Sequence, residues 1–479
     1  MAAVALLGAC GGGSSSPEAG GGGNAPLPPE TGYPAQWVWA SDKTIDPMPR
    51  AATDDDGFSP RIEQVRAGRV IAVYTRLGGT NRGSAEYDPN AIDTSAGAFS
   101  RMPYRRLDDG DLFLVYPAVY RGEDQQPWIG PLPSSAADFA AGRTSVPARI
   151  TIRGVTVGGV RPVIRMDATS ASNNTLGQAP IYVDQSLGVT IENIDVDGTG
   201  ARSAGKAGVY VNGATDLTLR DMRIHGFRAV SANGVFGTGN NAGTLRLERL
   251  RLYDNGGDSG PEHNVYINAS ETDPGFTVAM SGSWSYDVYF GHLFKSRAQR
   301  NVLSANYFMG ASAAVGGQAE SYLVDIPDGG ELTMTNNVLA KNRSGAGSNG
   351  NLLSYGVESF GARTHGLDIR HNSFVSFGCT YDGLHTIAPI YTGGFDPRRP
   401  PIGMNIVVEA NLLAGFCDVG AISPLFGASN SALPITAIAQ DFSATGAPAW
   451  SASTIIGTDT YAHANRLVAR TAKTVGAID

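Results

Sequence analysis

The sequence predicts an all-β solenoid, in which the chain winds as a stack of coils built from short strands. One pattern recurs along the middle of the chain. Two apolar residues are separated by one other residue, two more apolar residues follow two or three positions later, and polar or turn residues close the pattern. It begins at Val189, Leu217, Leu245, Val278, Asn301, Leu332, Leu367 and Ile406, so the copies stand 28, 28, 33, 23, 31, 35 and 39 residues apart. Repeats of this length bury their apolar side only by stacking on one another. No segment shows the i, i+3, i+4, i+7 pattern of helical repeats, and 62 glycines with only 17% charged residues suit a turn-rich β protein.

The first ten residues predict a lipid anchor. A short apolar run ends in Leu7, Gly8, Ala9 and Cys10, which looks like a bacterial lipoprotein signal in which Cys10 is acylated. The alternative is an ordinary secretory signal. Residues 11–30 are rich in Gly, Ser and Pro and would form a flexible tether. We therefore expect secretion across the inner membrane of a Gram-negative bacterium and lipid anchoring in the periplasm or at the outer membrane.

The repeats divide the rest of the chain into three parts. Residues 31–105 are irregular apart from a predicted strand at 70–74, and they would cap the first coil. Residues 106–430 form the solenoid, and residues 431–479 lose the repeat and would cap its other end. Cys379 and Cys417 follow their repeat starts by 12 and 11 residues, which places them on adjacent coils about 4.8 Å apart and predicts a structural disulfide.

The later copies share a turn asparagine just before their last apolar position. These residues are Asn306, Asn337, Asn372 and Asn411. Amides stacked at one turn can hydrogen-bond along the solenoid axis as a ladder. The alternative is that asparagine simply suits a turn.

Residues 106–430, with their repeats and an opening segment from Asp109 to Tyr120, resemble the right-handed parallel β-helix superfamily of pectate lyases, polygalacturonases and phage tailspikes. The resemblance implies a right-handed parallel β-helix. It does not imply one activity, because the superfamily contains lyases, hydrolases, epimerases and binding proteins. The Asp pairs typical of polygalacturonases and the arginine-centred motif of pectate lyases are missing, so the branch is not identified.

A second strand precedes each repeat start, and its outward positions predict a site. Because side chains alternate along a strand, one outward column contains Asp184, Asn212, Asn268, Lys295, Asp325 and Glu358. Arg297 shares this face two residues beyond Lys295, and Tyr266 lies on the preceding coil. His263 and His292 stand at strand edges on neighbouring coils, where each could be either functional or structural. We expect substrate contacts from Asn264, Asn268, Tyr322, Asp325, Tyr355 and Glu358.

These groups suit β-elimination from an acidic, uronic-acid-containing polysaccharide. The reaction needs the C5 carboxylate neutralised, a base for the C5 proton and an acid for the leaving oxygen. Lys295 or Arg297 could be base or carboxylate clamp, although guanidinium is a poor base. His263 or His292 could be base or acid, and Tyr266 could be the acid. The resemblance adds a possible Ca²⁺ site at Asp325, Asp328 and Glu358.

Two other functions remain open from the sequence. A glycoside hydrolase needs two carboxylates, which Asp325 with Asp328 or Glu358 could supply. A carbohydrate-binding or structural solenoid without turnover could use aromatic residues, of which Tyr182, Tyr210, Tyr266 and Tyr289 are candidates. The net charge of −8 and the absence of a basic-aromatic cluster argue against nucleic acid as partner. We expect a monomer.

Overall fold

A computed structural model describes the chain from residue 71 to residue 433, with gaps. The described residues are 71–73, 112–115, 119–121, 128–129, 149–154, 160–166, 179–199, 206–257, 262–269, 275–310, 320–341, 351–360, 363–376, 386–393, 395–414, 416, 425 and 431–433. Cys10, the tether at 11–30, Cys379 and Cys417 lie outside these residues. The lipid anchor and the disulfide therefore stay predictions.

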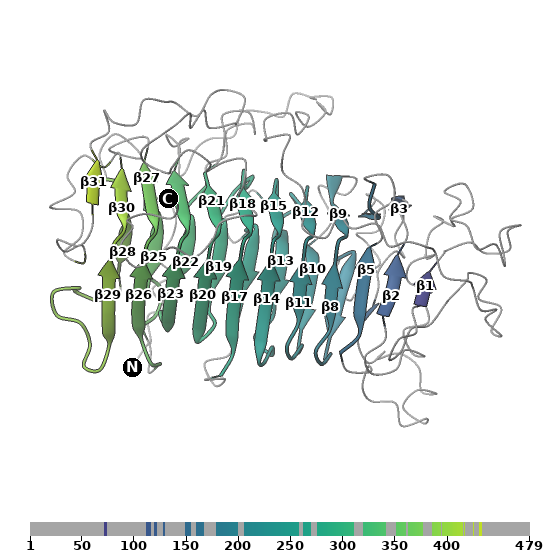
Figure 1. The fold of residues 1–479 in the computed structure, drawn as a ribbon, viewed down its shortest axis with the longest axis horizontal. Coiled ribbons are helices and arrows are strands. Elements are labelled where there is room, and N and C mark those ends of the chain that lie inside the picture. Colours follow the sequence, from purple (N-terminus) through teal and green to yellow (C-terminus); the bar gives the residue numbers. More distant parts are fainter. Residues whose placement is uncertain are drawn as a thin grey trace, which may run out of the picture.

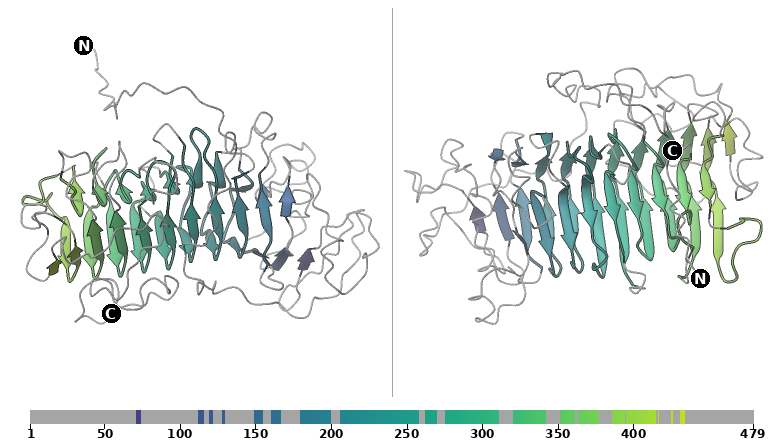
Figure 2. Two further views of the ribbon diagram at one scale, coloured as in Figure 1. Left: turned by 90° about the horizontal axis from the view of Figure 1, so that it is seen from above. Right: turned by 180° about the vertical axis from the view of Figure 1, so that it is seen from behind.

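The described residues form a right-handed parallel β-helix, as the sequence predicts (Figures 1 and 2). Strands stack in three parallel sheets of 11, 11 and 9 strands. Each complete coil contributes one strand to each sheet, and the sheets run side by side along the length of the molecule. The described residues contain no α-helix, so none of them forms a helix long and apolar enough to cross a membrane.

The strands are short, and each pairs with the strand one coil away. The first sheet contains β1 (Ile71–Val73), β2 (Leu112–Val115), β5 (Thr151–Gly154), β8 (Thr190–Glu192), β11 (Thr218–Arg220), β14 (Thr244–Glu248), β17 (Thr277–Ser281), β20 (Arg300–Ser304), β23 (Glu331–Thr335), β26 (Gly366–Arg370) and β29 (Asn405–Glu409). The second sheet contains β3 (Val119–Arg121), β6 (Val163–Arg165), β9 (Asp195–Asp197), β12 (Arg223–His225), β15 (Arg251–Tyr253), β18 (Trp284–Tyr286), β21 (Tyr307–Met309), β24 (Val338–Lys341), β27 (Ser373–Ser376), β30 (Leu412–Ala414) and β31 (Ser431–Leu433). The third sheet contains β4 (Trp128–Ile129), β7 (Ile181–Asp184), β10 (Ala207–Asn212), β13 (Asn233–Gly237), β16 (Val265–Ile267), β19 (Phe294–Ser296), β22 (Val324–Ile326), β25 (Leu353–Tyr355) and β28 (Ile390–Thr392).

The register of the first sheet confirms the repeat starts predicted from the sequence. Val278 pairs with both Leu245 and Asn301, and Leu367 pairs with both Leu332 and Ile406. The sheet also extends one strand into residues 31–105, where β1 pairs in parallel with β2. At the other end β31 pairs with β30, so the second sheet extends just beyond residue 430.

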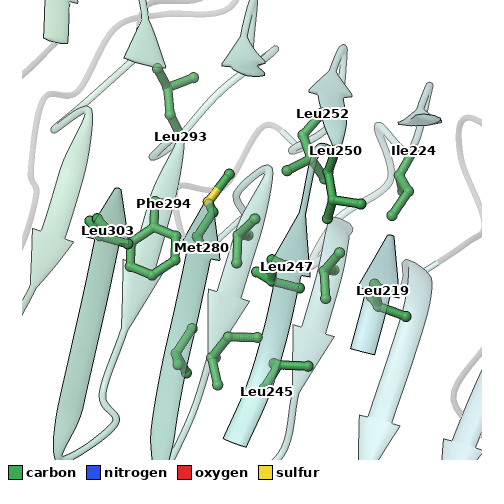
Figure 3. Packing of buried hydrophobic residues seen from close by; sticks show 14 of the residues in the cluster. Leu219, Ile224, Leu245, Leu247, Leu250, Leu252, Met280, Leu293, Phe294 and Leu303 are labelled. Atoms are coloured by element: carbon green, nitrogen blue, oxygen red, sulfur yellow. The ribbon is translucent and has the colours of Figure 1, made fainter. Parts of the chain in front are cut away.

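The core fills the space enclosed by the three sheets. Leu247, Met280 and Leu303 follow one another on successive coils of the first sheet and are fully buried (Figure 3). They pack with residues of the other two sheets, such as Leu252 and Phe294. Each coil can bury this apolar side only against its neighbours, which explains why the pattern repeats throughout the described solenoid.

The asparagine ladder is confirmed. The Nδ2 atoms of Asn306, Asn337 and Asn372 each donate to Oδ1 of the asparagine on the next coil, at 3.0, 2.9 and 3.1 Å. The backbone N–H groups of the same three residues donate to the same Oδ1 atoms, at 3.0, 2.9 and 2.8 Å. The ladder is fully buried from Asn306 through Asn411. These amides join the coils by accepting hydrogen bonds from backbone N–H groups of the turns, which apolar side chains could not do.

Candidate functional site

The third sheet sets the positions of the candidate residues through its strand register. Lys295 of β19 pairs with Tyr266 of β16 on one side and with Asp325 of β22 on the other. Arg297 follows β19 directly, and its backbone N–H donates to the carbonyl of Ile267, beside Asn268. The predicted outward column therefore needs a correction, because Arg297, and not Lys295, continues the line of Asn268.

Lys295 and Arg297 converge on the same carboxylate. Lys295 Nζ lies 2.6 Å from Glu358 Oε1, and the Arg297 guanidinium contacts Glu358 Oε2. The Glu358 side chain is 45% exposed, whereas that of Lys295 is only 10% exposed. A single carboxylate thus sits over two cations at the outer surface of the third sheet.

Two further carboxylates, those of Asp325 and Asp328, form ion pairs with Lys295 and Arg297. Asp325 Oδ2 lies 3.2 Å from Lys295 Nζ, and Asp328 Oδ1 lies 2.5 Å from the Arg297 guanidinium. Asp328 reaches this position because the chain turns after β22 through Gly329 and Gly330, whose positive φ values of 69° and 105° favour glycine. Both cations therefore lie on the coil of β19, and the three carboxylates lie on the following two coils.

Glu358 belongs to the segment after β25 and not to a strand. Its backbone N–H and that of Ser359 donate to the Pro327 carbonyl at 3.0 and 3.1 Å, which docks this segment on the neighbouring turn. Arg363 further along contacts the Arg297 carbonyl and lies 3.9 Å from Asp328 Oδ2. Sequence reasoning missed Arg363, because it lies outside every strand and no spacing links it to Arg297.

Tyr266 completes the group on the outer face. Arg297 Nε donates to its phenol oxygen at 3.3 Å, and Lys295 Nζ lies 5.8 Å from the centre of its ring. The predicted assembly of a phenol, two cations and two carboxylates from neighbouring coils is present, and Asp328 adds a third carboxylate.

The two histidines form a buried stack beside this group. The His263 and His292 rings are parallel within 16° with centroids 4.5 Å apart, and the Tyr322 ring stacks on His292 at 5.3 Å. The His292 backbone N–H donates to His263 Nδ1, and the Tyr322 backbone N–H donates to His292 Nδ1. His292 Nε2 faces Asp325 Oδ2 at 3.4 Å. Burial first, and then the neighbouring charges, lower the pKa of both histidines well below the usual value, so both rings are neutral.

Neighbouring carboxylates and burial have opposite effects on the pKa of Lys295. Burial alone would lower the pKa of the ammonium group, but the Asp325 and Glu358 carboxylates outweigh it and raise the Lys295 pKa. At Glu358, burial would raise the pKa, and the Lys295 and Arg297 partners lower it. In this arrangement Lys295 and Glu358 are both charged at neutral pH.

Asn264 and Tyr355 do not lie on the outer face. Asn264 is fully buried, and its Nδ2 donates to the Leu252 and Tyr286 carbonyls. Tyr355 is fully buried, and its hydroxyl donates to the Gly330 carbonyl. The sequence-based placement of both residues at a substrate surface is therefore corrected. Asn268 and Tyr322 are half-buried and Asn268 remains beside Arg297.

The three carboxylates do not fit a calcium site as they are arranged here. Asp325 pairs with Lys295, Asp328 with Arg297, and Glu358 with both cations. Calcium needs six to eight oxygen ligands free of such partners. Among the residues that the structure describes, no group of three or more His, Cys, Asp and Glu side chains could hold a metal ion. A calcium requirement stays a prediction from the resemblance.

Comparisons with known proteins identify similar folds at low identity. No protein-family model matches the sequence, and no curated protein matches it. Among solved structures, the chain is similar to the pectate lyase Pel9A, with a TM-score of 0.39 and 14% identity over 75% of this chain and 79% of that one. It is also similar to the PL6 family polysaccharide lyase Pedsa3628 from Pseudopedobacter saltans, with a TM-score of 0.26 and 12% identity over 69% of this chain and 89% of that one. At these TM-scores the likenesses carry no argument about the site.

Proposed function

We propose that this protein is a polysaccharide lyase that cleaves a uronic-acid-containing polysaccharide by β-elimination on the outer face of the third sheet. One observation carries the proposal: Lys295 and Arg297 hold a single carboxylate between them, beside the Tyr266 phenol. The Glu358 carboxylate occupies the place that a uronate carboxylate would take. Because Glu358 is exposed and lies outside the strands, we expect its side chain to turn aside when substrate binds.

The reaction divides among three residues. Arg297 binds the C5 carboxylate, so the charge that builds up when the C5 proton leaves is stabilised. Lys295 in its neutral form removes that proton, the C–H electrons form the C4–C5 double bond, and the C4–O bond breaks. Tyr266 donates its proton to the leaving oxygen. The histidines support the coil, because both Nδ1 atoms accept backbone hydrogen bonds and both rings are buried.

The hydrolase alternative finds less support in the geometry. Inversion or retention needs one carboxyl group able to give a proton and a second one to act as base or nucleophile. Each of the three candidate carboxylates faces a cation, which keeps Glu358 ionised, and Asp325 is 1% exposed beneath Lys295. None of them is therefore both accessible and free to donate a proton.

The direct test is to incubate the protein with uronate polysaccharides and to follow both unsaturated uronate and new reducing ends. β-Elimination produces both signals together, because each cleavage leaves a C4–C5 double bond. We expect Arg297→Ala to lower kcat/KM by roughly a hundredfold or more, and Arg300→Ala, an exposed arginine paired with Glu331, to change it little. New ends without unsaturation would show hydrolysis, and binding without either signal would show a non-catalytic protein.

A second test uses the pH dependence of turnover. Because Lys295 must lose its proton and its pKa in the free protein is raised, kcat/KM should rise with pH through the alkaline range and should still be rising at the ordinary lysine pKa of about 10.4. Glu358→Gln removes one of the carboxylates that raise the Lys295 pKa in the free protein, so the rise of kcat/KM should move to lower pH. If Lys295 only binds the carboxylate, kcat/KM will instead fall as Lys295 loses its charge, and that result would remove Lys295 from the role of base.

A further inference from the structure

A row of aromatic side chains leads along the third sheet to the candidate site. Tyr182, Tyr210, Phe236 and Tyr266 pair in register on successive coils, and Lys295 takes the next position. The ring centroids are 5.0, 5.1 and 5.5 Å apart, so each ring contacts the next. The row is therefore continuous with the group that holds the carboxylate.

The row is accessible over only part of its length. Tyr210, Phe236 and Tyr266 are half-buried, whereas Tyr182 is 8% exposed. The accessible part thus covers the two coils before Tyr266 and ends at Tyr182. Neighbouring coils are about 4.8 Å apart, so this length suits a short stretch of polysaccharide laid along the axis.

Polar groups without positive charge border the row beside Tyr210 and Phe236, whereas Tyr266 lies against Arg297 and Lys295. Asn212 Nδ2 donates to Asp184 Oδ1 at 2.7 Å, and Thr238 Oγ1 donates to Asn212 Oδ1 at 2.8 Å. None of the outward residues of β7, β10, β13 and β16 is basic. The exposed Lys206 precedes β10 and stands four residues before Tyr210, roughly 13 Å along the strand. We call Tyr210, Phe236, Asn212 and Thr238 the aromatic strip.

We propose that the aromatic strip binds an uncharged sugar residue next to the uronate in the same polysaccharide chain. The substrate would then be a polymer in which uronic acid alternates with a neutral or N-acetylated sugar. This inference rests on the proposed function, because it takes Lys295 and Arg297 as the place of the uronate carboxylate.

The physical reason is the cost of burying charge without a partner. A uronate on the aromatic strip would lose water and gain no cation, and the Asp184 carboxylate at the far end would repel it. An uncharged sugar has no such cost. Its C–H groups can pack on the rings, and its hydroxyls can hydrogen-bond with Asn212 and Thr238.

The test compares two kinds of polymer in separate binding and cleavage assays. Hyaluronan alternates glucuronate with N-acetylglucosamine, and polygalacturonate carries a carboxylate on every residue. We expect tighter binding of hyaluronan-type oligosaccharides, and Phe236→Ala should weaken that binding about fivefold to tenfold. Tyr253→Ala is the matched control, because Tyr253 is half-buried but lies on β15 of the second sheet, stacked on His225. Phe236→Lys should shift the preference toward polygalacturonate.

The two assays separate the two proposals. Equal or tighter binding of polygalacturonate by the unaltered protein, or equal effects of Phe236→Ala and Tyr253→Ala, would overturn the inference and leave the lyase proposal standing if unsaturated products form. Selective binding of the alternating polymer without unsaturated products would support sugar binding by the aromatic strip and overturn the lyase proposal. No binding of either polymer would overturn the inference.

Discussion

Lys295→Ala is expected to reduce turnover by roughly a hundredfold to ten-thousandfold, the range that general bases contribute. Of the base candidates from the sequence, Lys295 and Arg297 both reach the carboxylate position on the outer face. Lys295, whose Nζ lies 2.6 Å from Glu358 Oε1, is the better base, because guanidinium gives up its proton with difficulty. Arg297 would still bind the uronate, so KM should change less than kcat. The measurement is the rate of unsaturated product over a range of substrate concentrations.

The same substitution should also destabilise the fold, which the sequence alone does not predict. Asp325 is 1% exposed, and Lys295 Nζ lies 3.2 Å from it. Removing the lysine leaves a buried carboxylate without its cation, a change that typically costs about 3 to 5 kcal/mol. Although Lys295 occupies an outward position of its strand, its side chain therefore contributes to the stability of the fold.

A double variant separates catalysis from stability. Lys295→Ala with Asp325→Asn removes the unpaired charge, so it should recover much of the lost stability without recovering turnover. Urea unfolding and the product assay on the same samples give both values. Recovery of turnover in the double variant, or retained turnover in Lys295→Ala, would show that Lys295 is not the base.

The repeat starts could be predicted because burial in this fold has a simple period. An inward residue must meet an inward residue on the next coil, so Val278, Leu332 and Leu367 could be aligned from spacing and apolar character alone. Loops of different length do not disturb this rule. The same reasoning predicted the asparagine ladder, because turn amides at one register position can bond only along the axis.

The outward positions were harder to predict because no burial constraint aligns them. Lys295 was matched to Asn268 by its place near the strand end, whereas the strand pairing matches it to Tyr266. Contacts between distant loops, such as that between Arg363 and Asp328, depend on turn geometry that spacing does not reveal. Sequence reasoning therefore placed the charged groups on the correct coils but did not predict which residues they contact.

Asn337→Ala should cause one of the largest losses of stability available to a single substitution in the described solenoid. Asn337 Oδ1 accepts from the backbone N–H and Nδ2 of Asn306, both at 3.0 Å, and its Nδ2 donates to the Leu303 carbonyl at 2.8 Å. All these groups are buried, so alanine would leave several of them without partners. Each unsatisfied buried group costs about 1 to 3 kcal/mol, and we expect a total loss of about 3 kcal/mol or more in the free energy of unfolding.

Thr333→Ala provides the matched control, because Thr333 lies on β23 of the same coil but points outward and is half-buried. We expect it to change the free energy of unfolding by less than about 0.5 kcal/mol. Asn337→Asp should be more damaging at neutral pH than at acidic pH, because it retains the acceptor oxygens but buries a charge when ionised. Equal urea midpoints for Asn337→Ala and Thr333→Ala would show that the ladder reflects the preference of asparagine for turns and contributes little to holding the coils together.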